Sequence, residues 1–442
     1  MTIAALTRQA ISGPKAVLGL QRAGVVYAFV LIIVAFEVLT ASSGLQGLLS
    51  VSNVRNILDQ SALDGVLVIP MTYLLISGNF DLSIGATAGL AAGLGLMTAN
   101  HVGSAAGFVV AIAAGCAVGL VNGGLVQWVG VNAFIVTLGT LTAVQGVLLI
   151  VSNGQTILAS TNEFADIGGG FWTLWRGVPI AIGVLALAAA AFLGYRRVAG
   201  AQDSVAAAAR SWRALTAACL GVLALVVGAL FPGLLRESRE TWIMLGYMAV
   251  AALFLRYTVF GRRLYAVGGN AEAARLSGVR VSWYRIGAFV LCGLSAGFAG
   301  VLYAGKFGAV IPSALSTEEL PVIAAAILGG TSLFGGSGYV VKSVLGVLIL
   351  QTLSNGFALL NLGANLQYLV QGLVIVAAAA VYTVGGLTRR APRLTLEVAA
   401  SVAGRSDPAE PVAPPSVDAR PIVPSPASTE SSPHAHGDYG HG

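Results

Sequence analysis

The sequence predicts an all-α protein that crosses a membrane about twelve times. Three observations support this fold class. The 442-residue chain is 56% hydrophobic and only 10% charged, whereas soluble domains are about 25% charged. Apolar runs of about 20 residues recur from Gly24 to Gly386, and each is long enough to cross a hydrocarbon core of ~30 Å. Loops that carry many of the charged residues separate these runs.

We expect the apolar runs to form twelve membrane-spanning helices. The first run is long, lacks a small-residue cleavage site close behind it and is followed by more spans, so we interpret it as a retained helix rather than a signal peptide. The tenth run is short and begins with two glutamates and Pro321, which favours a broken or re-entrant helix. The runs cover residues 24–44, 57–77, 82–99, 105–128, 133–152, 177–195, 214–232, 241–257, 286–304, 318–330, 340–361 and 367–385.

The distribution of positive charge predicts that both chain ends lie in the cytoplasm. With twelve spans and an inner N-terminus, 17 Lys and Arg residues fall on the inner side. Cytoplasmic loops carry an excess of these residues, so the charge distribution supports the orientation. It also explains the net charge of +6 without a nucleic-acid partner. The outer side holds only 5 basic residues: Arg55, Arg176, Arg236, Arg239 and Lys306.

Composition divides the chain into three parts. Residues 1–23 form a short N-terminal segment that we place in the cytoplasm, and residues 24–386 form the membrane domain. Residues 387–442 are rich in Pro, Ala and Ser after the first few positions and cannot bury a core. We therefore predict a disordered cytoplasmic tail.

One carboxylate lies in the most apolar part of the sequence. Between residues 64 and 163 the only formal charge is Asp81, and burying an unpaired carboxylate costs several kcal/mol. Asp81 precedes a helix that we expect to begin at Leu82, where it can accept hydrogen bonds from the N–H groups of Ser83 and Ile84. Helix capping is one explanation. The other is that this helix break lines a translocation path or a subunit contact, because irregular backbone at membrane depth is tolerated only against protein or water.

The segment around Asp81 is similar to a second segment 251 residues later. Pro70–Gly85 is PMTYLLISGNFDLSIG, and Pro321–Gly336 is PVIAAAILGGTSLFGG. Both would run from outside to inside, which makes them parallel repeats of the kind that transporters contain, with interrupted helices at the pathway. Chance matching of small apolar residues is the alternative. The coincident pairs are Pro70 and Pro321, Ile76 and Ile327, Gly78 and Gly329, Leu82 and Leu333, and Gly85 and Gly336.

The sequence lacks the residue sets that catalysis would need. Of four histidines, His101 lies in a loop and the others lie in the tail, and the three cysteines have no metal-ligand spacing. The stretch Gly335–Ser343 differs from a phosphate-binding loop because Val341, not Gly, precedes Lys342. Charge within the spans is too sparse for a proton relay. We therefore predict no enzyme, metal or cofactor site, and an energy source on a partner chain.

The basic stretch Arg256–Arg285 is predicted to contain a short surface helix over residues 270–278. Asn270 is a good N-cap, Glu272 suits the first turn, and Gly278 suits the stop. Glu272 and Arg275 form an i,i+3 pair. An isolated helix this short is marginal. It is either a solvated connector or a docking helix for a cytoplasmic protein.

Four motifs carry a resemblance to a known family. They are FGRRLYAVGGNAEAARLSGV (260–279), ISGNFDLSIGA (76–86), VNAFIVTLGTL (131–141) and AAAILGGTSLFGGSG (324–338). In this order, and over roughly residues 53–382, the chain resembles the membrane permeases of monosaccharide ATP-binding-cassette importers, the ribose, xylose, arabinose and galactose class. The extra pair of spans between Pro179 and Thr241 is most similar to the longer, xylose-type permeases.

The resemblance implies a multi-pass permease of a bacterial cytoplasmic membrane. Two permease copies would form the pathway for a monosaccharide, such as the pentose xylose, within the lipid bilayer. Two cytoplasmic ATPase subunits, which bind ATP and Mg, would dock on the short helix, and an extracytoplasmic sugar-binding protein would deliver the sugar. The implied coupling residues are Gly268, Gly269, Asn270, Glu272, Ala273, Ala274, Arg275 and Gly278. The implied pathway or broken-helix residues are Asn79, Asp81, Ser83, Gly85, Gly329, Gly330, Thr331, Ser332, Gly335 and Gly336, and Leu82 also matches the motif.

The chain departs from the family pattern at three places, which keeps other cargoes open. Asn79–Phe80 stands where the family has Gly-Ile or Gly-Val, Pro321 replaces a common acidic residue, and Asn132 replaces a proline. The alternatives are a related importer permease for branched amino acids or nucleosides, an ion- or proton-coupled carrier, and a membrane-embedded enzyme. The Gly-Gly-Asn-x-x-Ala-Ala-Arg-x-Ser-Gly loop favours the sugar class.

Overall fold

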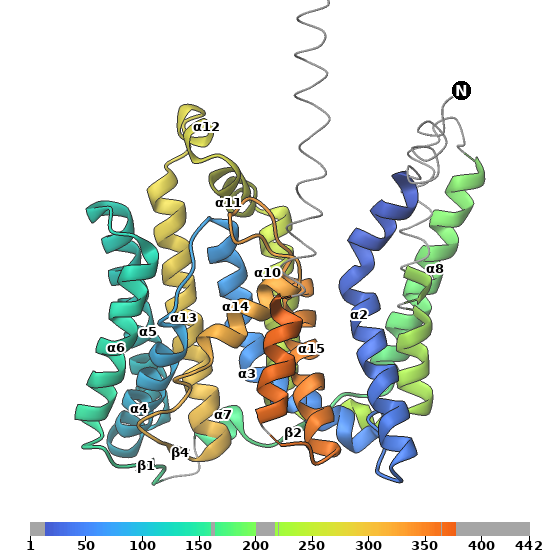
Figure 1. Cartoon of the computed structure of the whole chain (residues 1–442), viewed down its shortest axis with the longest axis horizontal. Coiled ribbons are helices and arrows are strands. Elements are labelled where there is room, and N and C mark those ends of the chain that lie inside the picture. The colour runs from blue at the N-terminus through green and yellow to red at the C-terminus, as the bar shows by residue number, and fades with distance from the viewer. Residues whose placement is uncertain (1–13, 161–163, 200–216, 220, 364, 377–442) are drawn as a thin grey trace, which may run out of the picture. The chain divides into compact units, whose positions relative to one another are not determined.

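The computed structural model describes residues 14–160, 164–199, 217–219, 221–363 and 365–376, which are mainly helical (Figure 1). The chain divides into two compact units, Met1–Gly386 and Leu387–Gly442. The second unit, which coincides with the predicted tail, lies outside the described residues, as do the first 13 residues of the predicted N-terminal segment.

The first half of the chain forms α2 to α8 with two short strands. Helix α2 already begins at Pro14, so the first helix starts before the apolar run predicted from residue 24. A five-residue π-helix, η1, continues α5 and ends at Gly130. The elements are α2 (Pro14–Ser42), α3 (Val51–Ile76), α4 (Ile84–Val102), α5 (Ser104–Gly124), η1 (Leu125–Val129), α6 (Ala133–Val151), β1 (Ile157–Leu158), α7 (Ala165–Gly168), β2 (Phe171–Thr173) and α8 (Gly177–Ala199).

The second half contains the short helix predicted in the basic stretch and a long helix that follows it. Helical residues also cover 217–219 and 221–230 before η2, and Asn365–Val376 after α15. The elements are η2 (Pro232–Leu235), β3 (Arg236–Ser238), α10 (Arg239–Tyr257), α11 (Val259–Gly269), α12 (Ala271–Leu276), α13 (Val281–Phe307), β4 (Ala309–Val310), α14 (Glu319–Leu328) and α15 (Val340–Leu359).

Two small antiparallel sheets lie next to the end of α13 and the start of α10, at the opposite end of these helices from α12. Strand β1 pairs with β4, and β2 pairs with β3 with Trp172 opposite Glu237. Helix α13 follows α12 and leads into β4, and its 27 residues span about 40 Å. The α12 end and the end with the strands are therefore separated by the length of a membrane-spanning helix.

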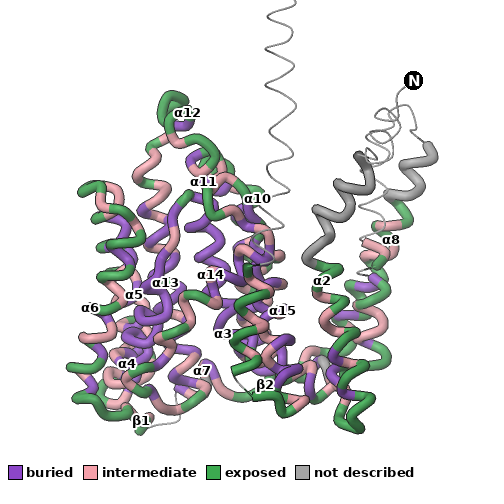
Figure 2. Tube along the Cα trace, in the orientation of Figure 1, coloured by how far each residue is buried: buried purple, intermediate pink, exposed green. Residues whose placement is uncertain are grey.

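Helix α3 forms the centre of the core. Every residue from Ser61 to Ile76 is buried, and α3 packs against α10, α13, α14 and α15 (Figure 2). Helix α13 contributes a second buried surface, which packs against α4 and α5. These two helices position the elements that carry the predicted site motifs.

Glycines allow α5 and α13 to pack backbone against backbone. A Cβ atom at Gly115 would overlap the carbonyl oxygen of Gly293, and one at Gly293 would overlap that of Gly115. A Cβ at Gly119 would likewise overlap the carbonyl oxygen of Phe289. Small residues at such interfaces let membrane helices approach closely.

The helical character agrees with a polytopic membrane protein, but the number of twelve spans is not confirmed. Among the described residues, four helices are long and apolar enough to cross a membrane, or five if a bent pair is one span. Helix α14 has only 10 residues, as its interrupted sequence suggested. Helix α3 carries Arg55, Asp59 and Asp64, which lower its apolar character. The four are Ser104–Val129, Ala133–Val151, Val281–Phe307 and Val340–Leu359, and the bent pair is α10 with α11.

Candidate functional site: a glycine junction beneath a short polar helix

Helix α12 is an exposed, locally capped helix within the predicted range 270–278. The Asn270 side-chain oxygen accepts from the Ala273 amide at 3.0 Å, and Gly278 has a positive φ of 80° after the last turn. Arg275 donates to Glu272 at 2.7 Å, and this hydrogen bond raises the pKa of Arg275. Of the helix, only Ala274 is buried. The Glu272 and Arg275 side chains are therefore exposed to solvent.

The end of α11, immediately before α12, lies against two helix breaks. A Cβ at Gly268 would overlap the carbonyl oxygen of Ile76, the last residue of α3, and lie 2.7 Å from the Gly336 nitrogen. A Cβ at Gly335 would lie 2.7 Å from the Gly268 oxygen and 3.0 Å from the Gly78 Cα. We call Gly78, Gly268, Gly335 and Gly336 the glycine junction.

Two hydrogen bonds hold the junction together. The Gly336 amide donates to the Ile76 carbonyl oxygen at 2.9 Å. The Tyr265 hydroxyl, on α11, donates to the Gly338 carbonyl oxygen at 2.7 Å. Tyr265 was not among the predicted site residues, and its contact depends on packing across 73 residues of sequence. Together these contacts join α11 to the last residue of α3 and to the loop that precedes α15.

The two helix breaks have the same backbone arrangement. At the end of α3, Gly78 donates to Leu75 and Asn79 donates to Leu74. At the end of α14, Gly330 donates to Ile327 and Thr331 donates to Ala326. Both are Schellman motifs with a glycine at positive φ, 83° for Gly78 and 86° for Gly330. The matched glycines are thus Gly78 and Gly330, one residue away from the pairing of Gly78 with Gly329 that the sequence suggested.

Asp81 lies in a buried polar network rather than in a simple cap. Its Oδ1 accepts from the Ser83 amide at 2.8 Å and the Ser83 hydroxyl at 2.6 Å, while α4 begins at Ile84 and not at Leu82. The Asn122 amide donates to Ser83 Oγ at 2.9 Å and lies 3.4 Å from Asp81 Oδ2. This network connects the break to α5.

The network extends to a third helix, α6. The Thr140 hydroxyl donates to Asn122 Oδ1 at 2.7 Å. Asn122 is fully buried, and neither it nor Thr140 was predicted as a site residue. The available signal was the asparagine in the apolar run 105–128, which has one other amide side chain, Gln127. These side chains fix α4, α5 and α6 around Asp81.

The other predicted pathway residues lie mainly at two places, the start of α4 and the loop before α15. Gly85 lies against the Leu315 carbonyl and Glu319 Oε2, so it allows the start of α4 to approach the segment before α14. Gly329 allows the end of α14 to pack on the backbone of Lys342 and Ser343. The Thr331 and Ser343 hydroxyls are 3.1 Å apart, and Ser332 Oγ accepts from the Phe334 amide. Gly329, Thr331 and Ser332 therefore stabilise the loop before α15. Asn79 is buried, and its amide contacts the Ser77 hydroxyl at 3.3 Å.

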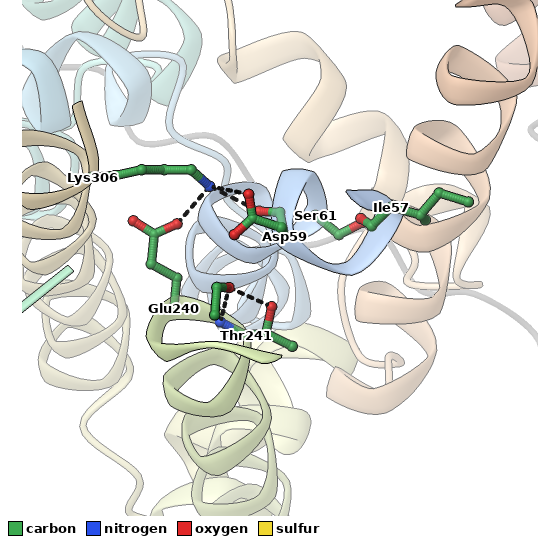
Figure 3. Close-up of polar contacts among 7 residues, drawn as sticks. Ile57, Asp59, Ser61, Glu240, Thr241 and Lys306 are labelled. Carbon is green, nitrogen blue, oxygen red and sulfur yellow. Dashed lines mark hydrogen bonds and ion pairs between the residues drawn. The ribbon is translucent and has the colours of Figure 1, made fainter. Parts of the chain in front are cut away.

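A charged cluster that the sequence did not predict lies at the end with the strands. Lys306 Nζ, in the last turn of α13, is 2.8 Å from Glu240 Oε2 and 3.0 Å from Asp59 Oδ2 (Figure 3). It also donates to the Asp59 carbonyl oxygen at 3.1 Å. In Figure 3 the lysine reaches between the two carboxylates, which belong to α10 and α3. One cation thus joins three helices opposite the α12 end.

A second ion pair flanks this cluster on β3. Arg55 Nε is 3.8 Å from Glu237 Oε1. Burial raises the pKa of Glu237 to about 7, against the lowering effect of Arg55 and with a further increase from Asp59. The Arg55 and Arg236 guanidinium groups lie 5.4 Å and 5.6 Å from the Phe171 ring centroid. The strands are therefore fixed to α3 by charge and cation–π contacts.

The chain is similar to a family of permeases over most of its length. The family model described as "Branched-chain amino acid transport system / permease component" matches residues 53–379. The Escherichia coli (strain K12) xylose transport system permease protein XylH is 35% identical over 343 residues, 75% of this chain and 84% of that protein. The ribose import permease protein RbsC of the same strain is 31% identical, over 75% of this chain and 86% of its own.

A third relative comes from another bacterium. The Azospirillum brasilense L-arabinose ABC transporter permease protein AraH is 31% identical over 81% of this chain and 86% of its own length. No solved structure matches the chain at a significant level. The family match covers all three parts of the glycine junction and α12. The chain therefore belongs to the family of ABC-transporter membrane permeases described by the branched-chain amino acid permease component, and it is a transport subunit rather than an enzyme.

Proposed function

We propose that the chain is the permease of an ATP-driven importer for a monosaccharide, and that its cargo is a pentose such as xylose. Three of the similar proteins carry xylose, ribose and L-arabinose in their names. The proposed coupling to an ATPase is supported by the glycine junction, which joins the base of α12 to the breaks after α3 and α14.

The junction supplies a route from α12 to the pathway. An ATPase docked on α12 changes the equilibrium of the permease only if it binds one permease conformation more tightly than another. Because Gly268 contacts the backbone of Ile76 and Gly336 without intervening side chains, a displacement of α11 shifts both breaks together. ATP and Mg bind on the ATPase, and this chain binds no cofactor in the proposed mechanism.

The proposed partners would bind at the two ends of the structure. We propose that the α12 end and both chain termini face the cytoplasm, where two ATPase subunits bind, and that the strand end faces the sugar-binding protein. A second copy of the chain completes the pathway. The Lys306 cluster then holds α3, α10 and α13 together on the outer side.

Uptake of labelled sugars tests the proposed cargo. Cells with and without the gene are supplied with labelled xylose, ribose, arabinose, galactose and glucose. Selective loss of pentose uptake, restored by wild type but not by an Arg275/Glu272 double variant, supports both cargo and coupling. Unchanged uptake of every sugar, in a strain without redundant importers, contradicts the sugar assignment.

The main alternative is an importer permease of the same superfamily for a branched amino acid or a nucleoside. The description of the matching family names branched-chain amino acid transport. Adding labelled leucine and a nucleoside to the uptake series separates these cargoes. An ion-coupled carrier is the remaining alternative, and dependence of uptake on a separate ATPase excludes it.

A further inference from the structure

Helix α10 and helix α11 form a sharp elbow near Thr258. The two helix axes differ by 73°. Thr258 has extended backbone, and its hydroxyl accepts from the Gly261 amide, which caps α11 at its first turn. If α10 follows the membrane normal, α11 lies close to the membrane plane.

Helix α11 has one apolar side and one basic side. Gly261, Leu264 and Val267 are buried against the protein, while Arg262 and Arg263 are exposed. The apolar side of α11 is therefore covered by the protein, and the basic side stays uncovered. The exposed guanidinium groups then lie at the depth of lipid phosphates.

The adjoining face of α10 is apolar and uncovered. Val250, Leu253, Phe254 and Tyr257 follow i, i+3, i+4 and i+7 spacing, and their exposed fractions are 66%, 57%, 42% and 64%. This stripe ends at Tyr257, whose ring lies 5.5 Å from the Arg256 guanidinium. Arg262 Nη1 donates to the Tyr257 carbonyl oxygen at 3.2 Å. The apolar stripe on α10 therefore ends beside Arg256 and Arg262.

Aromatic rings continue this surface onto the start of α13. Phe254 and Phe260 are 5.6 Å apart by ring centroids, and Phe260 and Tyr284 are 5.4 Å apart. Arg263 Nη1 donates to the Tyr284 hydroxyl at 2.9 Å. Tyrosine side chains with one apolar and one polar end are enriched where a membrane meets water.

Positive charge at this elbow is not balanced by carboxylates. From Thr241 to Thr317 the sequence has one acidic residue, Glu272, and it pairs with Arg275 on α12. Within the described residues, no ion pair with a carboxylate is formed by the five other arginines of this stretch, Arg256, Arg262, Arg263, Arg280 and Arg285.

We propose that the elbow binds an anionic phospholipid, with its phosphate at Arg256 and Arg262 and an acyl chain along Val250, Leu253 and Phe254. Uncompensated arginines supply the charge for the headgroup, and the exposed stripe supplies the apolar surface for the chain. An acidic patch on a partner protein would use the arginines but would leave the apolar stripe uncovered. The combination of both features favours a lipid.

Native mass spectrometry of the purified full-length chain tests this site. The chain is titrated with palmitoyl-oleoyl phosphatidylglycerol and, separately, with the phosphatidylcholine of the same acyl chains. We expect wild type to prefer phosphatidylglycerol, and R256Q/R262Q to reduce that preference roughly thirty-fold, from ~1 kcal/mol for each arginine. The control R176Q/R236Q removes the same charge at the strand end and should retain the preference. The variant R256K/R262K keeps the charge and should retain most of it, provided that all proteins are monodisperse.

Three results would overturn the proposal. An equal loss in R256Q/R262Q and R176Q/R236Q would show a diffuse charge effect without a site. Displacement of phosphatidylglycerol by inorganic phosphate at equal concentration would assign the arginines to free anions. Disulfide-linked dimers of a Leu253→Cys variant in membranes, in a background where the free cysteines Cys116, Cys219 and Cys292 are replaced by serine, would show that a second copy, not lipid, covers the stripe.

Discussion

The amide of Gly336 donates a hydrogen bond to the carbonyl oxygen of Ile76 at 2.9 Å, across more than half of the chain. Ile76 ends α3, and Gly336 lies in the loop between α14 and α15. Gly268 packs against both residues from the end of α11. The backbone atoms of three distant segments thus meet at one point below α12.

Gly268→Ala should impair the protein, whereas Gly269→Ala should be tolerated. A Cβ at Gly268 would overlap the Ile76 oxygen, but a Cβ at Gly269 would meet only the Gly336 Cα at 4.0 Å. Overpacking of this kind costs about 1–3 kcal/mol. We expect Gly268→Ala to lower the thermal unfolding midpoint and sugar uptake, measured on the purified protein and in cells. Equal effects of the two substitutions would show that close backbone approach at Gly268 is unimportant.

Replacing Glu272 and Arg275 together with glutamine should uncouple transport without unfolding the protein. Both side chains are more than 60% exposed, and exposed pairs contribute little to stability. If the ATPase docks on α12, uptake should fall about five-fold or more while ATP hydrolysis continues. Uptake and ATPase activity are measured together in proteoliposomes. The charge swap E272R/R275E restores the pair but not its orientation, so normal transport by the swap would argue against docking on these side chains.

The short helix α12 could be predicted from sequence because local rules determine it. Asn270 caps it, Glu272 and Arg275 pair within one turn, and Gly278 has the positive φ that favours glycine. The helix breaks were predictable for the same reason, since Gly78 and Gly330 terminate their helices locally. The one-residue offset between the two breaks was not predictable, because identical residues at a constant spacing do not determine at which residue a helix ends.

Contacts between distant segments could not be predicted from the sequence. Lys306 was assigned only to the outer side by the charge pattern, and its pairing with Glu240 depends on how α13 packs against α10. Likewise, Tyr265 reaches Gly338 only because α11 turns sharply at Thr258. The prediction of twelve spans has a related weakness. An apolar run in the sequence does not show whether its helix crosses the whole membrane, and α14 has only 10 residues.

Lys306→Met should destabilise the protein strongly, and the second substitution Glu240→Gln should partly compensate. Glu240 is 1% exposed, so removing its cation leaves a buried carboxylate. Breaking a buried pair by removing one partner costs about 3–5 kcal/mol. A double-mutant cycle based on unfolding midpoints in detergent measures the coupling between the two residues. Strict additivity of the two single effects would contradict a direct interaction.

Asp81→Ala should reduce stability more than Asp81→Asn. The alanine leaves the Ser83 amide and hydroxyl without their acceptor in a buried site, at a cost of about 1–3 kcal/mol. The asparagine keeps one acceptor oxygen beside Ser83. Thr140→Val serves as a control that removes the hydroxyl contacts with Asn122 Oδ1 and the Val136 carbonyl oxygen but leaves the hydrogen bonds of Asp81 in place. If sugar selectivity changes in a stable Asp81→Asn variant, the network has a direct role in the pathway.

Stability should fall as the pH rises towards 7, and Glu237→Gln should weaken this dependence. Burial raises the pKa of Glu237 from 4.5 to about 7, opposed by Arg55 and reinforced by Asp59. A carboxyl whose pKa is higher in the folded state binds its proton more tightly there, so its stabilising effect is complete below about 4.5 and is lost between that pH and about 7. Unfolding midpoints at pH 5, 6, 7 and 8 compare wild type with Glu237→Gln. Parallel curves for the two proteins would show that other groups cause the pH dependence, whereas a flatter curve for the variant would place the titration at Glu237, the acidic member of the ion pair with Arg55 that links β3 to α3.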